Sequence, residues 1–152
     1  MPRRQNDLQR SIDEFLAEVS EADADVILEG VMAACALIAY ADGKVAHEER
    51  TRMLSIIPRF TTLRYFPQSE LIDAFETATG WFEAEPVDGK LRALEAIARV
   101  RQHERYKMPL LRACHAIAIA DHSFDAREQE ALVIICSALD LDPVDFGLRE
   151  RV

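Results

Sequence analysis

The sequence is poor in the residues that break helices and form turns. Its 152 residues include 5 glycines and 6 prolines, which argues against the all-β class, because short strands need frequent turn residues between them. With 49% hydrophobic and 30% charged residues, the chain has the balance of a folded globule and not of a disordered tail. We expect a single domain over residues 1–152, long enough to bury a sizeable core.

Cysteine is scarce as well. Cys35, Cys114 and Cys136 are odd in number and contain no CxxC pair, so no disulfide framework is predicted. Each lies in an apolar run typical of a helix, where the small cysteine side chain is commonly a buried packing residue. Free thiols of this kind indicate a reducing cytosol, and we therefore expect a cytoplasmic protein.

Long apolar runs and excess positive charge are also missing. The longest apolar stretch, residues 31–41, is too short to span a bilayer, and the N-terminus leads straight into an amphipathic helix without a signal peptide. The net charge is −9, which argues against nucleic-acid or membrane binding and favours cations or basic protein partners. One basic stretch, residues 99–107, is interpreted as a solvated helix end and loop, with contact to an acidic partner as the alternative.

Apolar residues recur at helical spacing along almost the whole chain. We predict a first helix from about residue 6, then helices over about 25–41, 47–57, 69–82, 86–100, 109–121 and 126–139, and a short one from 143. Pro109 is placed in the first turn of its helix, where its missing N–H costs nothing. No strand pattern competes, so the predicted fold is an all-α, single-domain bundle of seven or eight helices.

The chain also repeats itself. When it is shifted by 79 positions, each copy shows an apolar helix ending on an aspartate, a tight loop with one apolar residue and a glutamate that opens the next helix. The shift pairs Cys35 with Cys114, Asp42 with Asp121, Val45 with Phe124 and Glu49 with Glu128. Because neither unit can bury its apolar helix alone, we expect the copies, about 26–57 and 109–139, to pack about a pseudo-twofold axis. We call the segments that follow the two apolar helices, and that begin at Asp42 and Asp121, the Asp loops.

The first Asp loop partly matches the calcium-binding loop of an EF-hand. The match fails upstream, because the first and third ligand positions carry side chains that cannot supply oxygen to a hard cation. These positions hold Ile38 and Tyr40 in the first copy, and Ile117 and Ile119 in the second. We therefore exclude a true EF-hand.

Two acidic motifs carry a specific family resemblance. Ala-x-Ala-Asp-Gly-x-Val-x-x-x-Glu, then Ala-Asp-x-x-Phe-Asp-x-x-Glu and a Leu-Asp-Leu-Asp-Pro ending, resemble the TerB family of tellurite-resistance proteins, which is similar to the N-terminal region of DjlA-type co-chaperones. The resemblance covers about residue 26 to the C-terminus. It implies an all-helical fold, an acidic surface at the Asp loops that binds divalent metal, and a role in tellurite and related stress responses. It further implies membrane-bound TerC-type proteins as partners in some systems.

The acidic positions of the family define the candidate metal ligands. They fall on Asp42, Glu49, Asp121 and Glu128, to which we add the nearby Asp125. Oxygen ligands favour Ca²⁺, Mg²⁺ or Mn²⁺, whereas His47 and His122 would suit Zn²⁺. One departure from the family is that His122 stands where a glycine is expected after the second aspartate.

The same carboxylates have a structural alternative. An N-cap at Asp125 with Glu128 at the third helical position would form a capping box, and Asp42 and Asp121 could close turns around their loops. Ala46, however, is a poor cap for the first copy. The two aspartates also lie at helix C-termini, where the macrodipole disfavours an anion unless a metal ion or a basic side chain is near.

The motifs of common enzyme classes are missing too. We find no nucleophile elbow, phosphate loop or metalloprotease helix, so we expect no enzyme. We expect instead a non-enzymatic TerB-like stress-response domain whose acidic surface binds a divalent cation, a protein partner or both. The alternative is a plain protein-interaction domain with structural acidic loops and no metal, its contact made by exposed aromatics near Tyr65 and Phe66.

Overall fold

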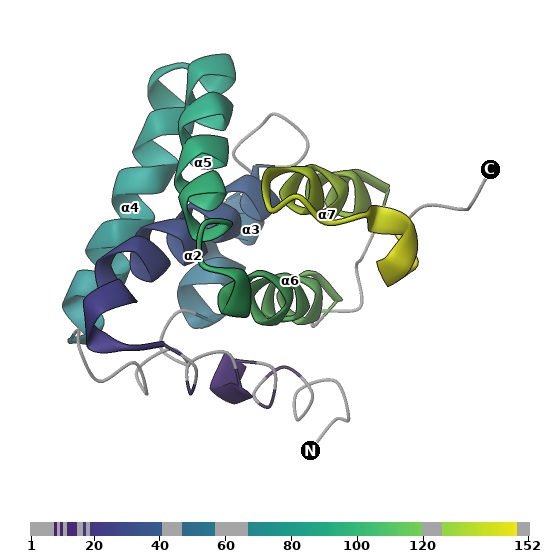
Figure 1. The fold of residues 1–152 in the computed structure, drawn as a ribbon. Coiled ribbons are helices and arrows are strands. Elements are labelled where there is room, and N and C mark those ends of the chain that lie inside the picture. The colour runs from purple at the N-terminus through teal and green to yellow at the C-terminus, as the bar shows by residue number, and fades with distance from the viewer. Residues whose placement is uncertain are drawn as a thin grey trace.

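The chain folds as a bundle of helices (Figure 1). The computed structural model describes residues 8, 10, 12–14, 17, 19–40, 47–56, 67–119 and 126–148, with only the backbone described at 47–50. The helices are η1 (Glu21–Asp23), α2 (Ala24–Ala39), α3 (His47–Ile56), α4 (Gln68–Ala84), α5 (Pro86–Val100), α6 (Glu104–Ile119), α7 (Ala126–Ala138) and η3 (Pro143–Phe146). These ranges contain no strand, which confirms the all-α prediction. They also contain no helix that combines the length and apolar character needed to cross a bilayer.

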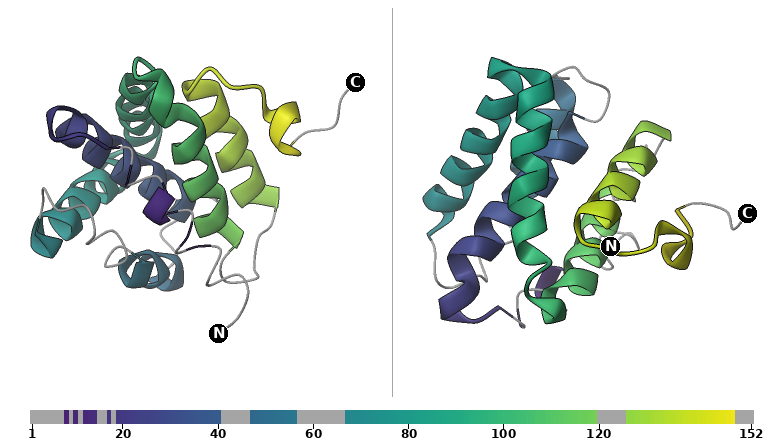
Figure 2. Two further views of the ribbon diagram at one scale, coloured as in Figure 1. Left: turned by 60° about the horizontal axis from the view of Figure 1, so that its bottom comes forward. Right: turned by 45° about the horizontal axis from the view of Figure 1, so that its top comes forward.

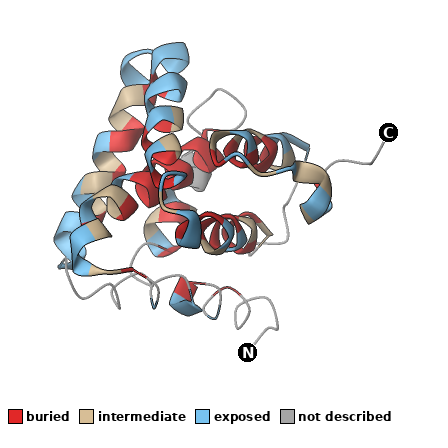
Figure 3. Ribbon diagram, in the orientation of Figure 1, coloured by how far each residue is buried: buried red, intermediate tan, exposed pale blue. Residues whose placement is uncertain are grey.

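Helix α2 forms the centre of the bundle. Every residue from Gly30 to Ala39 is buried, because this part of the helix is apolar on every side and other helices surround it. The antiparallel α4–α5 pair and the α6–α7 pair both pack on α2, and two further views show α6 and α7 side by side (Figure 2). Colouring by burial places the exposed residues of α4 and α5 away from this central helix (Figure 3).

The predicted start of the sixth helix was wrong. Helix α6 begins at Glu104, and Pro109 lies inside it and not in its first turn. The extra turn carries Tyr106, which is fully buried, and Lys107, which is buried too. Tertiary burial of this turn outweighs the backbone hydrogen bond that an internal proline removes. The first helix of the second repeat copy therefore starts at Glu104 and not at residue 109.

The helix bounds agree with the offset of the repeat. Helices α3 and α7 begin at His47 and Ala126, which are 79 positions apart, the same shift that aligns the sequence copies. In each copy the second helix contacts the first, α3 on α2 and α7 on α6. The pseudo-twofold packing of the two copies stays a prediction.

Gly89 lets α5 pack closely on the end of α4. A single residue, Glu85, separates the two helices, and a Cβ added at Gly89 would lie 2.6 Å from backbone atoms of Trp81 and Phe82. Backbone atoms cannot move aside as a flexible side chain does, so this position requires glycine. Gly80, in contrast, has no atom within 4 Å of an added Cβ.

These two glycines give a matched test of the packing. Gly89→Ala is expected to lower the free energy of unfolding by about 1–3 kcal/mol, because the methyl group overpacks the contact between α4 and α5. Gly80→Ala is expected to raise it by about 0.5–1 kcal/mol, because alanine costs less backbone entropy in a helix. Urea denaturation measures both changes. Equal stabilities for the two variants would contradict the close approach at Gly89.

Candidate functional site

The predicted metal ligands are only partly within the described residues. Asp42, Asp121 and Asp125 lie outside them. Glu49 and Glu128 each occupy the third position of a helix, α3 and α7 respectively, as the count along the sequence repeat expects. The side chain is described for Glu128 alone of these five.

Glu128 is buried and paired with a cation. Its residue is 5% exposed, and its Oε2 lies 3.3 Å from Nη2 of Arg52. Helix N-termini favour carboxylates, because the backbone N–H groups there carry partial positive charge. A buried carboxylate also needs a positive partner to offset its desolvation. Arg52, whose side chain is 13% exposed, provides that partner.

Arg52 joins three helices. Besides pairing with Glu128, its Nη1 donates a hydrogen bond to the carbonyl oxygen of Ile117 at 2.9 Å. That carbonyl lies in the last turn of α6, where carbonyls lack partners within the helix. We call these two contacts the Arg52 bracket. It links α3, which follows the first Asp loop, to α6 and α7, which lie on either side of the second.

The fit of the residues to a divalent metal can be tested on Glu128. The carboxylate faces a guanidinium group, whose positive charge would repel a second cation at short range. Glu128 is therefore poorly placed to be an outward-facing ligand. Across the described ranges, no three His, Cys, Asp or Glu residues are grouped so that they could hold a metal ion. A metal site of the predicted kind has to be built from Asp42, Glu49, Asp121 and Asp125.

The three cysteines are packing residues, as predicted. All three are buried and free of disulfides. Burial raises the pKa of the Cys35 thiol to about 12 and that of Cys136 to about 11, and it raises the pKa of Cys114 well above its ordinary value. Thiols with such pKa values stay protonated at neutral pH and are poor nucleophiles.

A pocket lies where α2, α4, α5 and α7 meet. Its volume is about 560 Å³, and its apolar lining includes Leu37, Phe82 and Ile134. The ring of Tyr40 stacks on Phe82 with the centroids 5.0 Å apart, and its hydroxyl donates to Oε1 of Glu83 at 3.0 Å. The sequence reasoning missed this pocket, because its lining comes from four helices.

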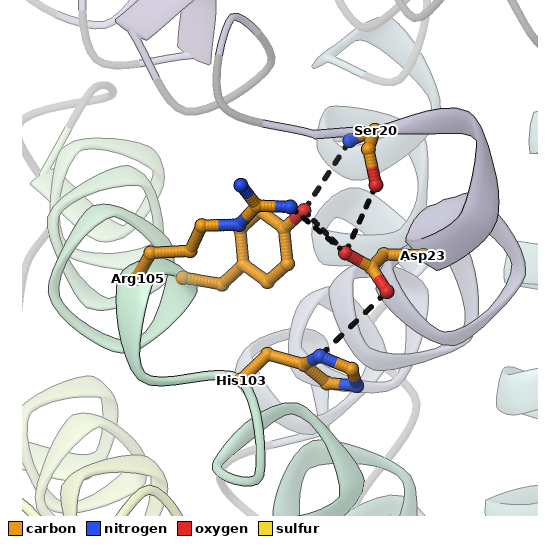
Figure 4. A network of polar contacts seen from close by, with 5 residues as sticks. Ser20, Asp23, His103 and Arg105 are labelled. Carbon is orange, nitrogen blue, oxygen red and sulfur yellow. Dashed lines mark hydrogen bonds and ion pairs between the residues drawn. The ribbon is translucent and has the colours of Figure 1, made fainter.

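A second polar cluster ties the chain before α2 to the start of α6 (Figure 4). Oδ2 of Asp23 accepts hydrogen bonds from the hydroxyl of Tyr106 at 2.7 Å, from Oγ of Ser20 at 3.0 Å and from Nη2 of Arg105 at 3.1 Å. Nδ1 of His103 lies 3.6 Å from the other carboxylate oxygen. Because Ser20 donates to Asp23 and not to His103, these residues are not arranged as a serine–histidine–aspartate catalytic triad.

Ion pairs within the protein account for much of the basic stretch at residues 99–107. Arg105 and His103 face Asp23, Nη1 of Arg99 pairs with Glu29 at 2.7 Å, and the buried Lys107 pairs with Glu104. Much of this stretch therefore serves ion pairs within the protein. It is less available to an acidic partner than its composition alone would indicate.

Residues 28–150 match the family model described as "Tellurite resistance protein TerB". No curated protein and no solved structure matches the chain. The matched range contains the Arg52 bracket and every residue that lines the pocket, whereas Ser20 and Asp23 lie upstream of it.

Loss of Arg52 should expose the cost of the buried carboxylate. Arg52→Met is expected to lower the free energy of unfolding by about 3–5 kcal/mol, because Glu128 is left buried without its cation. Arg52→Met combined with Glu128→Leu should recover most of this, because both buried charges are then gone. Urea denaturation measures each variant.

The matched control is Arg92→Met, which breaks an ion pair with Asp88 whose side chains are 58% and 60% exposed. This variant should lower the free energy of unfolding by less than about 1 kcal/mol. If Arg52→Met costs no more than this control, the Arg52 bracket does not stabilise the fold as described.

The Asp23 cluster should make stability fall in acid. Hydrogen bonds from Tyr106, Ser20 and Arg105 lower the pKa of Asp23 below its ordinary value of 3.8. A carboxyl group with a lower pKa in the folded chain stabilises the fold above its unfolded pKa, and this stabilisation is lost as the pH falls through the folded value. Melting temperatures of Asp23→Asn should therefore fall less steeply below about pH 4 than those of the unmodified chain. The exposed Asp25 provides the control: Asp25→Asn should keep the steep dependence, and a steep dependence in both variants would contradict the assignment.

Proposed function

Because the chain belongs to the TerB family, we propose that it is a non-catalytic binding module that acts in the response to tellurite and related stresses. Its ligand is a divalent cation, a basic surface of a protein partner, or both. The binding residues are the acidic side chains at the two Asp loops: Asp42, Glu49, Asp121 and Asp125. A TerC-type membrane protein is the proposed class of partner, and the cytoplasm the proposed location.

The Arg52 bracket is the observation that carries this proposal. Nη1 and Nη2 of Arg52 contact Ile117 on α6 and Glu128 on α7, so the helices that flank the second Asp loop are tied to α3, which follows the first. A joint acidic surface needs this closeness, since two loops on opposite ends of the bundle could not share a ligand. The bracket therefore supports a common site for the two loops.

The proposal gives Glu128 a bracing role. Its carboxylate is neutralised by Arg52 and buried, so it fixes the start of α7 and leaves the ligand to the other acidic residues. The two glutamates that the sequence repeat pairs then differ in role, Glu49 as a ligand and Glu128 as a brace. This difference follows from Arg52, whose counterpart in the second copy is Ala131.

The buried thiols support two parts of the proposal, namely that the protein is not a catalyst and that it lies in the cytoplasm. Cys35, Cys114 and Cys136 have raised pKa values, so they are poor candidates for chemistry on a bound substrate. Free buried cysteines are typical of proteins kept in a reducing compartment.

Thermal unfolding with added metal tests the proposal. A ligand that binds only the folded chain stabilises it by RT ln(1 + [L]/Kd), which is about 2.7 kcal/mol at a hundredfold excess over Kd. We expect a higher melting temperature with at least one of Ca²⁺, Mg²⁺, Mn²⁺ and Zn²⁺ at millimolar concentration than with a chelator. The combined variant Asp42→Asn, Asp121→Asn should lose this shift.

The control removes equal charge elsewhere. Asp73 on α4 and Glu95 on α5 are exposed, and neither pairs with another group in the described part of the chain. Asp73→Asn with Glu95→Gln should keep the full shift, which separates a local site from a general charge effect. If no metal raises the melting temperature of the unmodified chain, the proposal of metal binding is wrong. The proposal of a protein-interaction domain then remains.

That interaction domain is the second candidate function. The sequence placed its contact near Tyr65 and Phe66, which lie outside the described residues. The observation that favours an interaction domain is a different surface, the pocket between α2, α4, α5 and α7.

A further inference from the structure

The pocket has the size and lining of a binding site. Its volume of about 560 Å³ falls within the range of roughly 300–1,000 Å³ that is typical of protein binding pockets. Leu37, Phe82, Ala131 and Ile134 provide apolar surface, while charged side chains lie among the other lining residues. A lining that combines apolar and charged side chains favours a ligand that buries apolar groups and also forms ion pairs.

The apolar surface continues out of the pocket along α5. Val87 lines the pocket and is 71% exposed, and Leu91 is 55% exposed. Residues four apart on a helix lie on the same face, one turn from each other. We call Val87 and Leu91 the α5 ridge. Large apolar side chains exposed beside an apolar pocket indicate a surface that another molecule covers.

The shape of this surface favours a helix over a small molecule. Leu91 is not part of the pocket lining, so a compound bound within the pocket would leave it exposed. A helix that lies along α5 would cover both ridge residues and insert its own apolar side chains into the pocket. Amphipathic helices bind apolar grooves in this manner, with anchor residues one turn apart.

The charges at the pocket select the charge of the partner. Glu83 accepts a hydrogen bond from Tyr40, and Arg127 and Glu130 also take part in interactions within the protein. Lys90, between the two ridge residues in sequence, makes no hydrogen bond or ion pair within the described part of the chain. A partner carboxylate can therefore pair with Lys90 without displacing an existing contact.

We propose that the pocket and the α5 ridge bind an amphipathic helix of a partner protein, with apolar side chains in the pocket and an acidic side chain on Lys90. This surface is distinct from the Asp loops, which favour cations or a basic partner. The two proposals can therefore fail separately: the metal test does not involve the pocket, and the test below does not involve the Asp loops.

Selection from a phage-displayed library of helical peptides of about 16 residues tests the proposal. The full chain is expected to enrich peptides with large apolar residues three or four positions apart and an acidic residue beside them. Synthetic copies of these peptides should bind the combined variant Val87→Ser, Leu91→Ser at least about tenfold more weakly. The matched control on α6 is Met108→Ser, which also removes an exposed apolar side chain and should leave binding unchanged.

A charge exchange tests the role of Lys90. Lys90→Glu should lower the affinity for the acidic peptides about tenfold. Replacing the acidic residue of the peptide by lysine should restore binding to this variant. Arg112→Glu, an equal charge change at an exposed position of α6, should have little effect. Circular dichroism and melting temperatures check that each variant is folded.

Several results would overturn the proposal. The selection could enrich no peptide, or it could enrich peptides whose binding does not change in the Val87→Ser, Leu91→Ser variant. The lysine-substituted peptide could also bind the Lys90→Glu variant no more tightly than the original acidic peptide does. Binding of the apolar anionic dye anilinonaphthalene sulfonate to the pocket, together with a selection that enriches no peptide, would reassign the pocket to small amphiphiles.

Discussion

Burial of the second part of α2, Gly30 to Ala39, on every side is the constraint on which the rest of the structure depends. A helix that is apolar around its circumference cannot lie at a surface, so other helices have to cover it. The α4–α5 pair, the α6–α7 pair and α3 all contact it. This arrangement brings the end of α2 to the pocket, where Leu37 and Tyr40, the residue after the helix, form part of the lining. The same helix leads directly into the first Asp loop.

Two carboxylates, the buried Glu128 and the partly buried Asp23, are held by polar partners. Glu128 has Arg52, and Asp23 has Tyr106, Arg105 and Ser20. Both arrangements join segments far apart in sequence, α3 to α6 and α7 in one case, and η1 to α6 in the other. Because a buried charge without a partner is costly, the pair at Glu128 favours a single way of placing α3, α6 and α7 against one another. The hydrogen bonds to Asp23 add a second link, between η1 and α6.

The two proposed binding surfaces would select different partners. The acidic residues proposed as ligands at the Asp loops would attract cations, in keeping with the net charge of −9. The α5 ridge instead offers apolar area beside Lys90, and it favours an acidic amphipathic segment. Under the two proposals together, the domain would hold a metal ion or a basic partner on one surface and an acidic helix of a second protein on the other.

Helical periodicity and the internal repeat came from the sequence by itself, because they depend on residues close together in the chain. They predicted the all-α fold, most helix positions, the buried cysteines and the place of Glu128 at the third position of α7. Only the tertiary structure decided the start of α6, where burial of Tyr106 extends the helix upstream of Pro109. It also decided the Arg52–Glu128 pair and the pocket, since both are made where faces of different helices meet, and no local pattern in one helix specifies which face of another it will contact.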